Sequence, residues 1–176
     1  MPRVFVVADT HFGHENIIEY ERRPFRSVEE MDAVLVRFWN QVVGEEDTVW
    51  HLGDVAVCGA ERTRELVRAL RGRKHLVLGN HDLSRTVTFW KKAGFLEVFE
   101  GPVELPGVLL SHGPAAEVLA GRINVHGHCH GRGSAGRRAV CVSVELTGYR
   151  PVLLGAGAVF VGTREEVWPC APRLNS

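Results

Sequence analysis

The chain has 176 residues, a hydrophobic content of 45%, a charged content of 24% and a formal net charge of zero. This composition is typical of a single soluble globular domain, residues 1–176, that is large enough to bury a hydrophobic core. A neutral chain does not attract nucleic acid by its overall field, so any recognition of phosphate is expected to be local.

The cysteines and the apolar runs bear on the compartment. Cysteines 58, 129, 141 and 170 form no CxxC pair, which indicates reduced thiols in a cytoplasmic protein. The N-terminus enters an apolar strand without a basic-then-apolar leader. The longest apolar run, Val152 to Val161, is too short to span a bilayer. We therefore expect a cytoplasmic protein without a membrane segment, either a monomer or a homodimer.

Strands and helices are expected to alternate in the first half of the chain. Strands are predicted at residues 3–8, 48–52 and 75–78. The first of these is apolar at both odd and even positions, which is typical of a strand buried on both faces. Helices are predicted at residues 28–43 and 60–71, the first with a capping box formed by Ser27 and Glu30. Ser84 is predicted to cap a short third helix that ends at Ala93.

After Gly94 the pattern changes to short apolar runs broken by glycine and proline. Strands are predicted at residues 95–98, 103–105, 108–110, 123–125 and 140–144. Val152 to Leu154 is a candidate for a last strand, and Thr163 to Val167 for a short turn. The chain is thus predicted to be an α/β protein whose second half is mostly β.

Each of the stronger predicted strands is followed by polar residues that can bind metal. These residues are Asp9 and His11, then Asp54, then Asn80 and His81, then His112, and finally His128 and His130. In α/β sheets, ligands bind at the carboxyl ends of the strands. An Asp that stands alone after a glycine, as Asp54 does, can offer one oxygen to each of two cations about 3.5 to 4 Å apart. Oxygen and nitrogen donors without thiolate favour Mn, Fe, Co, Ni or Zn over Mg or Ca.

Three histidines alternate along the segment from Val125 to His130. In an extended chain, residues 126, 128 and 130 leave the same face and can converge on one point. The alternative is a His-rich surface loop that binds metal adventitiously. His51 and His126 lie on predicted strands, so we interpret them as buried supporting groups. Cys129 alternates away from the histidines and is expected to pack as a small hydrophobic residue.

Taken together, the motifs resemble those of the calcineurin-like metallophosphoesterase superfamily. The motifs in question are Asp9-x-His11, Gly53-Asp54, Gly79-Asn80-His81-Asp82, Ser111-His112 and Gly127-His128-x-His130, in the order of the family. Several segments are similar in sequence to small bacterial and phage phosphoesterases without an accessory domain, namely DTHFGH, RRPF, HLGD, LGNHD and HGHCHG. The resemblance covers most of the chain, from the first strand to about residue 130.

This resemblance implies a four-layer α-β-β-α sandwich, with two facing mixed β-sheets flanked by helices and a dinuclear site on loops at one sheet edge. One metal would be held by Asp9, His11 and His130, and the other by Asn80, His112 and His128. Asp54 would bridge the two metals. The expected cofactor is two divalent transition metal ions, Mn²⁺ first, with Fe, Ni, Co or Zn as alternatives.

The resemblance also implies the reaction. A hydroxide that bridges the two metals attacks phosphorus in line, and His81 protonates the departing oxygen as general acid. Asp82 is expected to orient the His81 imidazole. For His14, substrate contact and an ordinary loop position are both open. For Arg132 and Arg137, which could also reach phosphate, a solvated loop is the preferred interpretation.

One departure from the family bears on the substrate. Family members that dephosphorylate proteins continue the second motif as GDxVDRG, whereas this chain has Val57 and Cys58 in place of the acid and the arginine. This difference argues against a protein phosphatase. We therefore expect a phosphodiesterase that acts on small or nucleotide-like diesters. The alternatives are a DNA or RNA nuclease, a phosphomonoesterase, and a non-catalytic metal-binding scaffold, which the presence of His81 beside Asn80 disfavours.

Overall fold

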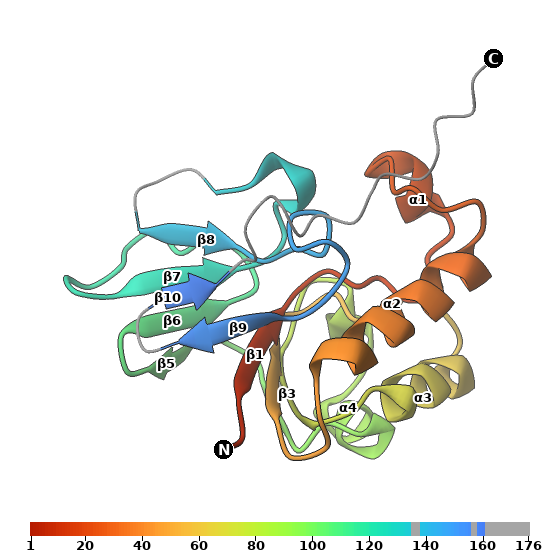
Figure 1. Cartoon of the computed structure of the whole chain (residues 1–176), viewed down its shortest axis with the longest axis horizontal. Coiled ribbons are helices and arrows are strands. Elements are labelled where there is room, and N and C mark those ends of the chain that lie inside the picture. The colour runs from red at the N-terminus through yellow and green to blue at the C-terminus, as the bar shows by residue number, and fades with distance from the viewer. Residues whose placement is uncertain (135–137, 156–157, 161–176) are drawn as a thin grey trace.

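The computed structural model describes residues 1–134 and 138–155, together with the backbone of residues 158–160 (Figure 1). The helices are α1 Asn16–Tyr20, α2 Val28–Val42, α3 Ala60–Ala69 and α4 Val87–Ala93, with 3-10 turns at Asp82–Ser84 and His130–Arg132. The strands are β1 Val4–Val7, β2 Thr48–His51, β3 Arg73–Val77, β4 Glu97–Phe99, β5 Val103–Leu105, β6 Val108–Ser111, β7 Ile123–His126, β8 Ala139–Cys141, β9 Val152–Gly155 and β10 Ala158–Phe160.

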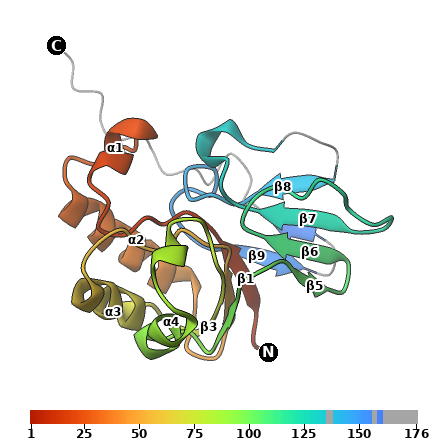
Figure 2. The same ribbon diagram turned by 180° about the vertical axis from the view of Figure 1, so that it is seen from behind.

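The strands form two mixed sheets. The first has six strands in the order β10-β9-β1-β2-β3-β4, of which β1 to β4 are parallel and β9 runs antiparallel to both of its neighbours. The second has four strands in the order β5-β6-β7-β8, and only the β5–β6 pair is antiparallel (Figure 2). The alternation of strands and helices in the first half, and the mostly β second half, are confirmed.

The position of strand β1 between two hydrophobic clusters explains why its sequence is apolar at both odd and even positions. Phe5 and Val7 belong to a hydrophobic cluster shared with the helices, whereas Val6 and Ala8 belong to a second cluster shared with β6, β7 and the segment after β8. Successive side chains of a strand point to opposite faces, so β1 is covered on both sides. The first sheet therefore lies between the helices and the second sheet.

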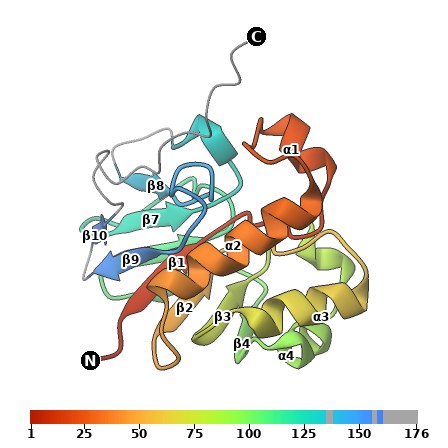
Figure 3. The same ribbon diagram turned by 45° about the vertical axis from the view of Figure 1, so that its right-hand side comes forward.

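Helix α2 is built as its pattern predicts. Met31, Leu35 and Trp39 lie one turn apart and are buried, which places the apolar face of the helix on the six-stranded sheet (Figure 3). Ser27 Oγ accepts the N–H of Glu30 at 3.2 Å, so Ser27 is the N-cap. The Glu30 carboxylate, however, accepts the N–H of Arg26 instead of that of Ser27, so the box closes one residue earlier than expected.

All four α-helices of the described residues contribute side chains to the same cluster on the six-stranded sheet. The expected arrangement of two facing mixed sheets flanked by helices is confirmed. The α-helices among the described residues cover the six-stranded sheet on the face opposite the second sheet. Ser84 is not the N-cap of α4, as the sequence suggested: it lies in the 3-10 turn, and Thr86 Oγ1 accepts the N–H of Phe89. The strand predicted at Val152 to Leu154 is confirmed as β9, but it is not the last strand, because β10 follows it. Thr163 to Val167 lie outside the described residues.

The two sheets meet at one edge. Ala8, just after β1, forms a parallel bridge with Ser143, and its N–H and C=O pair with Val142 and Val144 at 3.1 Å each. This junction brings the carboxyl end of β1 next to the segment that follows β8. The loops after the parallel strands of both sheets consequently gather at a common edge.

Candidate metal centre

The structure brings the predicted ligand residues together at this common edge. Asp9 and His11 follow β1, Asp54 follows β2, Asn80 and His81 follow β3, His112 follows β6, and His128 and His130 follow β7. Their donor atoms form two adjacent groups that share Asp54.

The first group consists of Asp9, His11 and His130, whose donor atoms all lie within 4.8 Å of one another. Asp9 Oδ2 accepts hydrogen bonds from Ser143 Oγ at 2.5 Å and from the N–H of His128 at 2.9 Å. Its Oδ1 is buried and has no hydrogen-bond partner among the described residues. Burial raises the pKa of Asp9 to about 6, because desolvation disfavours the charged carboxylate.

The second group consists of Asn80, His112 and His128. Asn80 Oδ1 lies 2.9 Å from His112 Nε2 and 3.1 Å from His128 Nδ1, and the two ring nitrogens are 3.2 Å apart. His112 Nδ1 lies 2.8 Å from the carbonyl oxygen of Leu52, a contact that assigns the proton to Nδ1 and leaves Nε2 with its lone pair. One amide oxygen and two imidazole nitrogens therefore converge on one point.

Asp54 lies between the two groups. Its Oδ2 is 3.5 Å from Nε2 of His11 and 3.6 Å from Nε2 of His112. Its Oδ1 accepts the N–H of His81 at 2.9 Å, which fixes the orientation of the carboxylate. The side chain is buried, with 3% of its surface exposed, so Oδ2 is directed into the site and not into solvent.

Unsatisfied buried atoms test whether these residues suit a cation. Both ring nitrogens of His11 are buried without a hydrogen-bond partner among the described residues, as is Asp9 Oδ1. Burial, and then the nearby charge of Arg23, lower the pKa of His11, so this imidazole is neutral and keeps a lone pair. Buried polar groups are nearly always paired. A bound cation would satisfy Asp9 Oδ1 and one ring nitrogen of His11, so the donor set fits a metal site.

Two residues that the sequence analysis missed support His130. Glu145 Oε1 lies 3.1 Å from His130 Nδ1, and it also accepts hydrogen bonds from Nη2 and Nε of Arg23 at 2.6 and 2.9 Å. Burial opposes the imidazolium, but the hydrogen bond to Glu145 and the charge of Asp9 leave the pKa of His130 raised. Arg23 also donates to the backbone carbonyls of Asp9 and Thr10.

Arg23 lies in the RRPF motif, but the sequence does not show that it is buried and therefore needs a partner. For Glu145 the sequence offered no signal, because it follows the last strand of the second sheet without a motif around it. Only the folded chain shows that these two residues meet across 122 positions of sequence.

The backbone at the centre is strained. Asp9, His11, Asp54, His128 and His130 all have positive φ, between 47° and 67°. Only two other non-glycine residues among those described, Arg22 and Tyr149, share this left-handed conformation. Such conformations cost about 1–3 kcal/mol each and cluster at functional sites. The fold therefore spends stability to direct these five side chains.

Two glycines allow the loops to approach closely. A Cβ on Gly79 would collide with the backbone nitrogen and Oδ1 of Asp54, and one on Gly127 would collide with Ala8 Cβ and Asp9 Oδ2. The Gly-Asn-His and Gly-His-x-His motifs thus have a steric reason for their glycines.

The position of Asp82 differs from the expectation. Its carboxylate does not orient the His81 imidazole: Oδ2 accepts the N–H groups of Asp54 and Gly79 at 2.8 and 2.9 Å, and Oδ1 accepts that of Val55 at 2.9 Å. Burial raises the pKa of Asp82 to about 6, although these amides favour the carboxylate. Asp82 therefore ties the loop after β3 to the loop that carries Asp54.

His81 and His14 lie at the open side of the centre. The His81 side chain is 43% exposed, and its Nε2 is 3.9 Å from Asp54 Oδ2. The His14 ring is half-buried, with its centroid 5.4 Å from that of His11 and 6.1 Å from that of His81. Burial lowers the pKa of His14. Both imidazoles can therefore reach a molecule bound at the centre.

The remaining polar residues singled out in the sequence are placed as follows. His51 is buried, with Nε2 3.0 Å from Thr10 Oγ1, and burial lowers its pKa to about 3. His126 is also buried, and its ring contacts Gly127 O and Ser134 Oγ. Both are supporting groups, as expected. Cys129 is half-buried, Arg132 is exposed, and Arg137 lies outside the described residues.

None of the helices among the described residues combines the length and the apolar character needed to cross a membrane.

Comparisons with known proteins agree with the motifs. Residues 2–138 match the family described as calcineurin-like phosphoesterase. An uncharacterised protein of Methanocaldococcus jannaschii is 36% identical over 166 residues, which cover 88% of each chain. A protein of unknown function from Aquifex aeolicus shares 28% identity at a TM-score of 0.66, over 87% of this chain and 96% of that one.

A second solved structure shares the fold at lower identity. It is the nuclease MPE of Pseudomonas putida, with a TM-score of 0.51 and 22% identity over 73% of this chain and 62% of that one. The family match covers most of the chain, and it extends over the strands and loops that carry the two groups of ligand residues. The chain therefore belongs to the calcineurin-like phosphoesterase family.

Proposed function

We propose that the chain is a dinuclear metal-dependent phosphodiesterase that acts on small or nucleotide-like diesters. The observation that carries the proposal is the position of Asp54 Oδ2, 3.5 Å from a nitrogen of His11 and 3.6 Å from a nitrogen of His112. One carboxylate oxygen thus faces a ligand from each group, as a bridge between two cations requires.

The residues divide between two cations. Asp9, His11 and His130 would hold one, and Asn80, His112 and His128 the other, with Asp54 in common. Divalent cations, when bound, supply Lewis acidity that lowers the pKa of water and neutralises charge on phosphoryl oxygens. The mixture of oxygen and imidazole donors favours a transition metal over Mg or Ca. Mn²⁺ is proposed first, with Fe, Co, Ni or Zn as alternatives.

His81 is the proton donor in this proposal. Its imidazole is exposed at the open side of the centre, while the backbone N–H of His81 donates to Asp54 Oδ1 at 2.9 Å. An alkoxide leaves phosphorus poorly, so a proton delivered to the departing oxygen accelerates the reaction. His14 faces His81 across the entrance and is proposed to contact a phosphoryl oxygen or the ester group.

The charge around the centre supports a diester over a monoester. A monoester brings up to two negative charges and is usually clamped by a guanidinium. In this chain Val57 and Cys58 replace the arginine motif. Arg23 is buried, and its nitrogens are engaged by Glu145, Met31 and two backbone carbonyls. A diester carries one negative charge and needs no such clamp.

A nuclease is the second proposal for the same centre. Two observations favour it: the fold shared with a Pseudomonas putida nuclease, and the exposed guanidinium of Arg132 two residues beyond His130. The neutral net charge weighs against strong binding of a long polyanion. Cleavage of single-stranded oligonucleotides with a steep dependence on salt would support this second proposal.

The test is a comparison of substrates with metal-loaded protein. With Mn²⁺, we expect hydrolysis of bis-p-nitrophenyl phosphate to exceed that of p-nitrophenyl phosphate, and chelation to abolish both. Asp54→Asn should lower the metal content of the purified protein as well as its turnover. Failure of the Mn²⁺-loaded wild type to cleave either bis-p-nitrophenyl phosphate or any cyclic nucleotide would refute the phosphodiesterase.

A further inference from the structure

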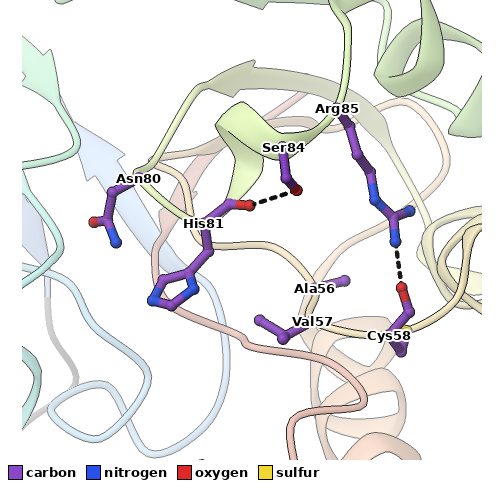
Figure 4. A pocket seen from close by; sticks show the side chains of 7 residues that line it. All are labelled: Ala56, Val57, Cys58, Asn80, His81, Ser84 and Arg85. Carbon is purple, nitrogen blue, oxygen red and sulfur yellow. Dashed lines mark hydrogen bonds between the residues drawn. The ribbon is translucent and has the colours of Figure 1, made fainter.

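A pocket of about 360 Å³ lies beside His81 and borders the second ligand group through Asn80. It is lined by Ala56, Val57, Cys58, Asn80, His81, Ser84 and Arg85 (Figure 4). Figure 4 shows Asn80 and Arg85 at opposite ends of the pocket, with His81 and Ser84 between them. The segment from Ala56 to Cys58 forms its apolar floor.

The guanidinium of Arg85 is held rigidly at the far end. It lies over the Phe89 ring, 4.4 Å from the centroid, and its Nη2 donates to the carbonyl oxygen of Cys58. Stacking of this kind fixes a guanidinium in one orientation. Because little rotational freedom remains to be lost, a ligand that reaches Arg85 meets a pre-organised donor.

One nitrogen of this guanidinium is unsatisfied. Arg85 Nη1 is buried and has no hydrogen-bond partner among the described residues. No carboxylate in the described part of the chain forms an ion pair with Arg85, whereas the other arginine that stacks on Phe89, Arg64, is paired with Glu61 at 2.9 Å. Arg85 as a whole is half-buried, and a guanidinium that lines a pocket without a carboxylate partner favours an anionic ligand.

The pocket has a defined relation to the reaction. If His81 protonates the departing oxygen, the group attached to that oxygen leaves the centre past His81 and enters this pocket. From the phosphorus at the metal ligands, the order along the substrate is then Asn80, His81 and finally Arg85 (Figure 4). The apolar floor suits a sugar or a ring, and the positive charge of the guanidinium beyond it suits a phosphate.

We propose that this pocket is the leaving-group subsite and that Arg85 recognises a second phosphate carried by the leaving group. The inference rests on the proposed phosphodiesterase activity and narrows its substrate to a nucleotide that bears an additional phosphate. Arg85 is then a specificity-determining residue, because it contacts a part of the substrate that does not react.

The experiment compares substrates with and without that phosphate. The set is bis-p-nitrophenyl phosphate, the dinucleotide TpT, and TpT with an added phosphate at its 5′ end (pTpT) or at its 3′ end (TpTp), all with Mn²⁺-loaded full-length protein. For the wild type we expect kcat/KM to be at least tenfold higher for pTpT or TpTp than for TpT. The end at which the phosphate has this effect identifies the leaving nucleoside.

Arg85→Ala should reduce that preference at least tenfold, mainly through KM, while its effect on the other two substrates is much smaller. Arg85→Lys keeps the charge but not the fork and should retain part of the preference. Arg64→Ala is the matched control, since Arg64 stacks on the same ring but does not line the pocket; it should leave every ratio unchanged.

Three outcomes would overturn the inference. The first is a wild type that does not prefer pTpT or TpTp to TpT, which is decisive even if Arg85→Ala fails to fold. The second is an Arg85→Ala protein with equal losses on all substrates, which would place Arg85 at the reacting phosphate. The third is an unchanged preference in that variant. Absence of wild-type activity on every substrate would instead refute the proposed function itself.

Discussion

The guanidinium of Arg23 lies 2.6 Å from the carboxylate of Glu145, and the same carboxylate oxygen faces Nδ1 of His130 at 3.1 Å. This buried chain fixes the tautomer and direction of the imidazole, so that Nε2 of His130 faces Asp9 and His11. It also ties the loop after β1 to the segment after β8, because Arg23 donates to the carbonyl of Asp9.

Replacing Glu145 with glutamine should therefore weaken one metal position and not the other. The substitution removes the negative charge beside the His130 imidazole, which supports this ring as a metal ligand. Such supporting contacts are worth about 10–100-fold in metal affinity. Metal titration followed by elemental analysis should show one weakened equivalent. Glu97→Gln is the control, since Glu97 faces His75 at 3.2 Å away from the centre. Metal affinities equal to those of the wild type at both positions would contradict this role of Glu145.

His81→Ala tests the proposed proton donor. We expect turnover of diesters to fall by about 10²-fold or more, because general acid catalysis typically contributes that factor. The metal content should not change, since His81 is not among the proposed ligands. Substrates with a good leaving group, such as p-nitrophenolate, should suffer a smaller loss than alkyl diesters. Loss of bound metal in this variant would mean that His81 is a ligand.

Gly79→Ala tests the close approach of the two loops. The added Cβ would overlap with Asp54 Oδ1 and with the backbone nitrogen of Asp54, so the Asp54 carboxylate has to move. Overpacking of this kind costs about 1–3 kcal/mol, and we expect metal affinity to fall at both positions. Gly59→Ala is the matched control, because nothing lies within 4 Å of its Cβ position. Measurements of the denaturant midpoint and of metal content would separate the two effects.

Asp47 predicts a pH dependence of stability far from the centre. The side chain of Arg3, and the N–H groups of Arg3 and Gly44, bind its carboxylate and lower its pKa from 3.8 to about 2. Since the folded state favours the charged form, this contribution is complete above pH 3.8 and is lost as the pH falls towards 2. Asp47→Asn should therefore be less stable than the wild type at pH 6, and the difference should shrink near pH 2. A constant difference in urea midpoints across that range would contradict this account.

The sequence predicted the ligand loops well, because each combines a strong local pattern with a position at a strand end. Asp9, Asp54 and Asn80 follow buried runs, and parallel strands bring their carboxyl ends to one edge. Contacts between distant segments could not be predicted in this way. The pairing of Arg23 with Glu145 spans 122 positions, and Asp82 binds backbone amides instead of its neighbour's ring, a choice that depends on how two loops dock.

Errors of the sequence interpretation were local. Ser84 and Thr86 are both good helix caps, and propensity alone does not separate them. Thr86 forms the cap because Asp82 is held in a tight turn by three backbone amides, which delays the start of α4 by two residues. The short helix α1 was missed because its five residues lack a clear apolar period.

The two ligand groups each draw on both sheets. Asp9 and His11 come from the six-stranded sheet and His130 from the four-stranded one, and Asn80 is likewise completed by His112 and His128. A chain that has emerged from the ribosome only as far as β4 consequently possesses neither complete site. If the two groups hold cations as proposed, cation binding would have to wait until the second sheet has docked, and each ion would then link one half of the protein to the other. Metal binding would then be a late step of folding, which occurs only in molecules whose two sheets have docked correctly.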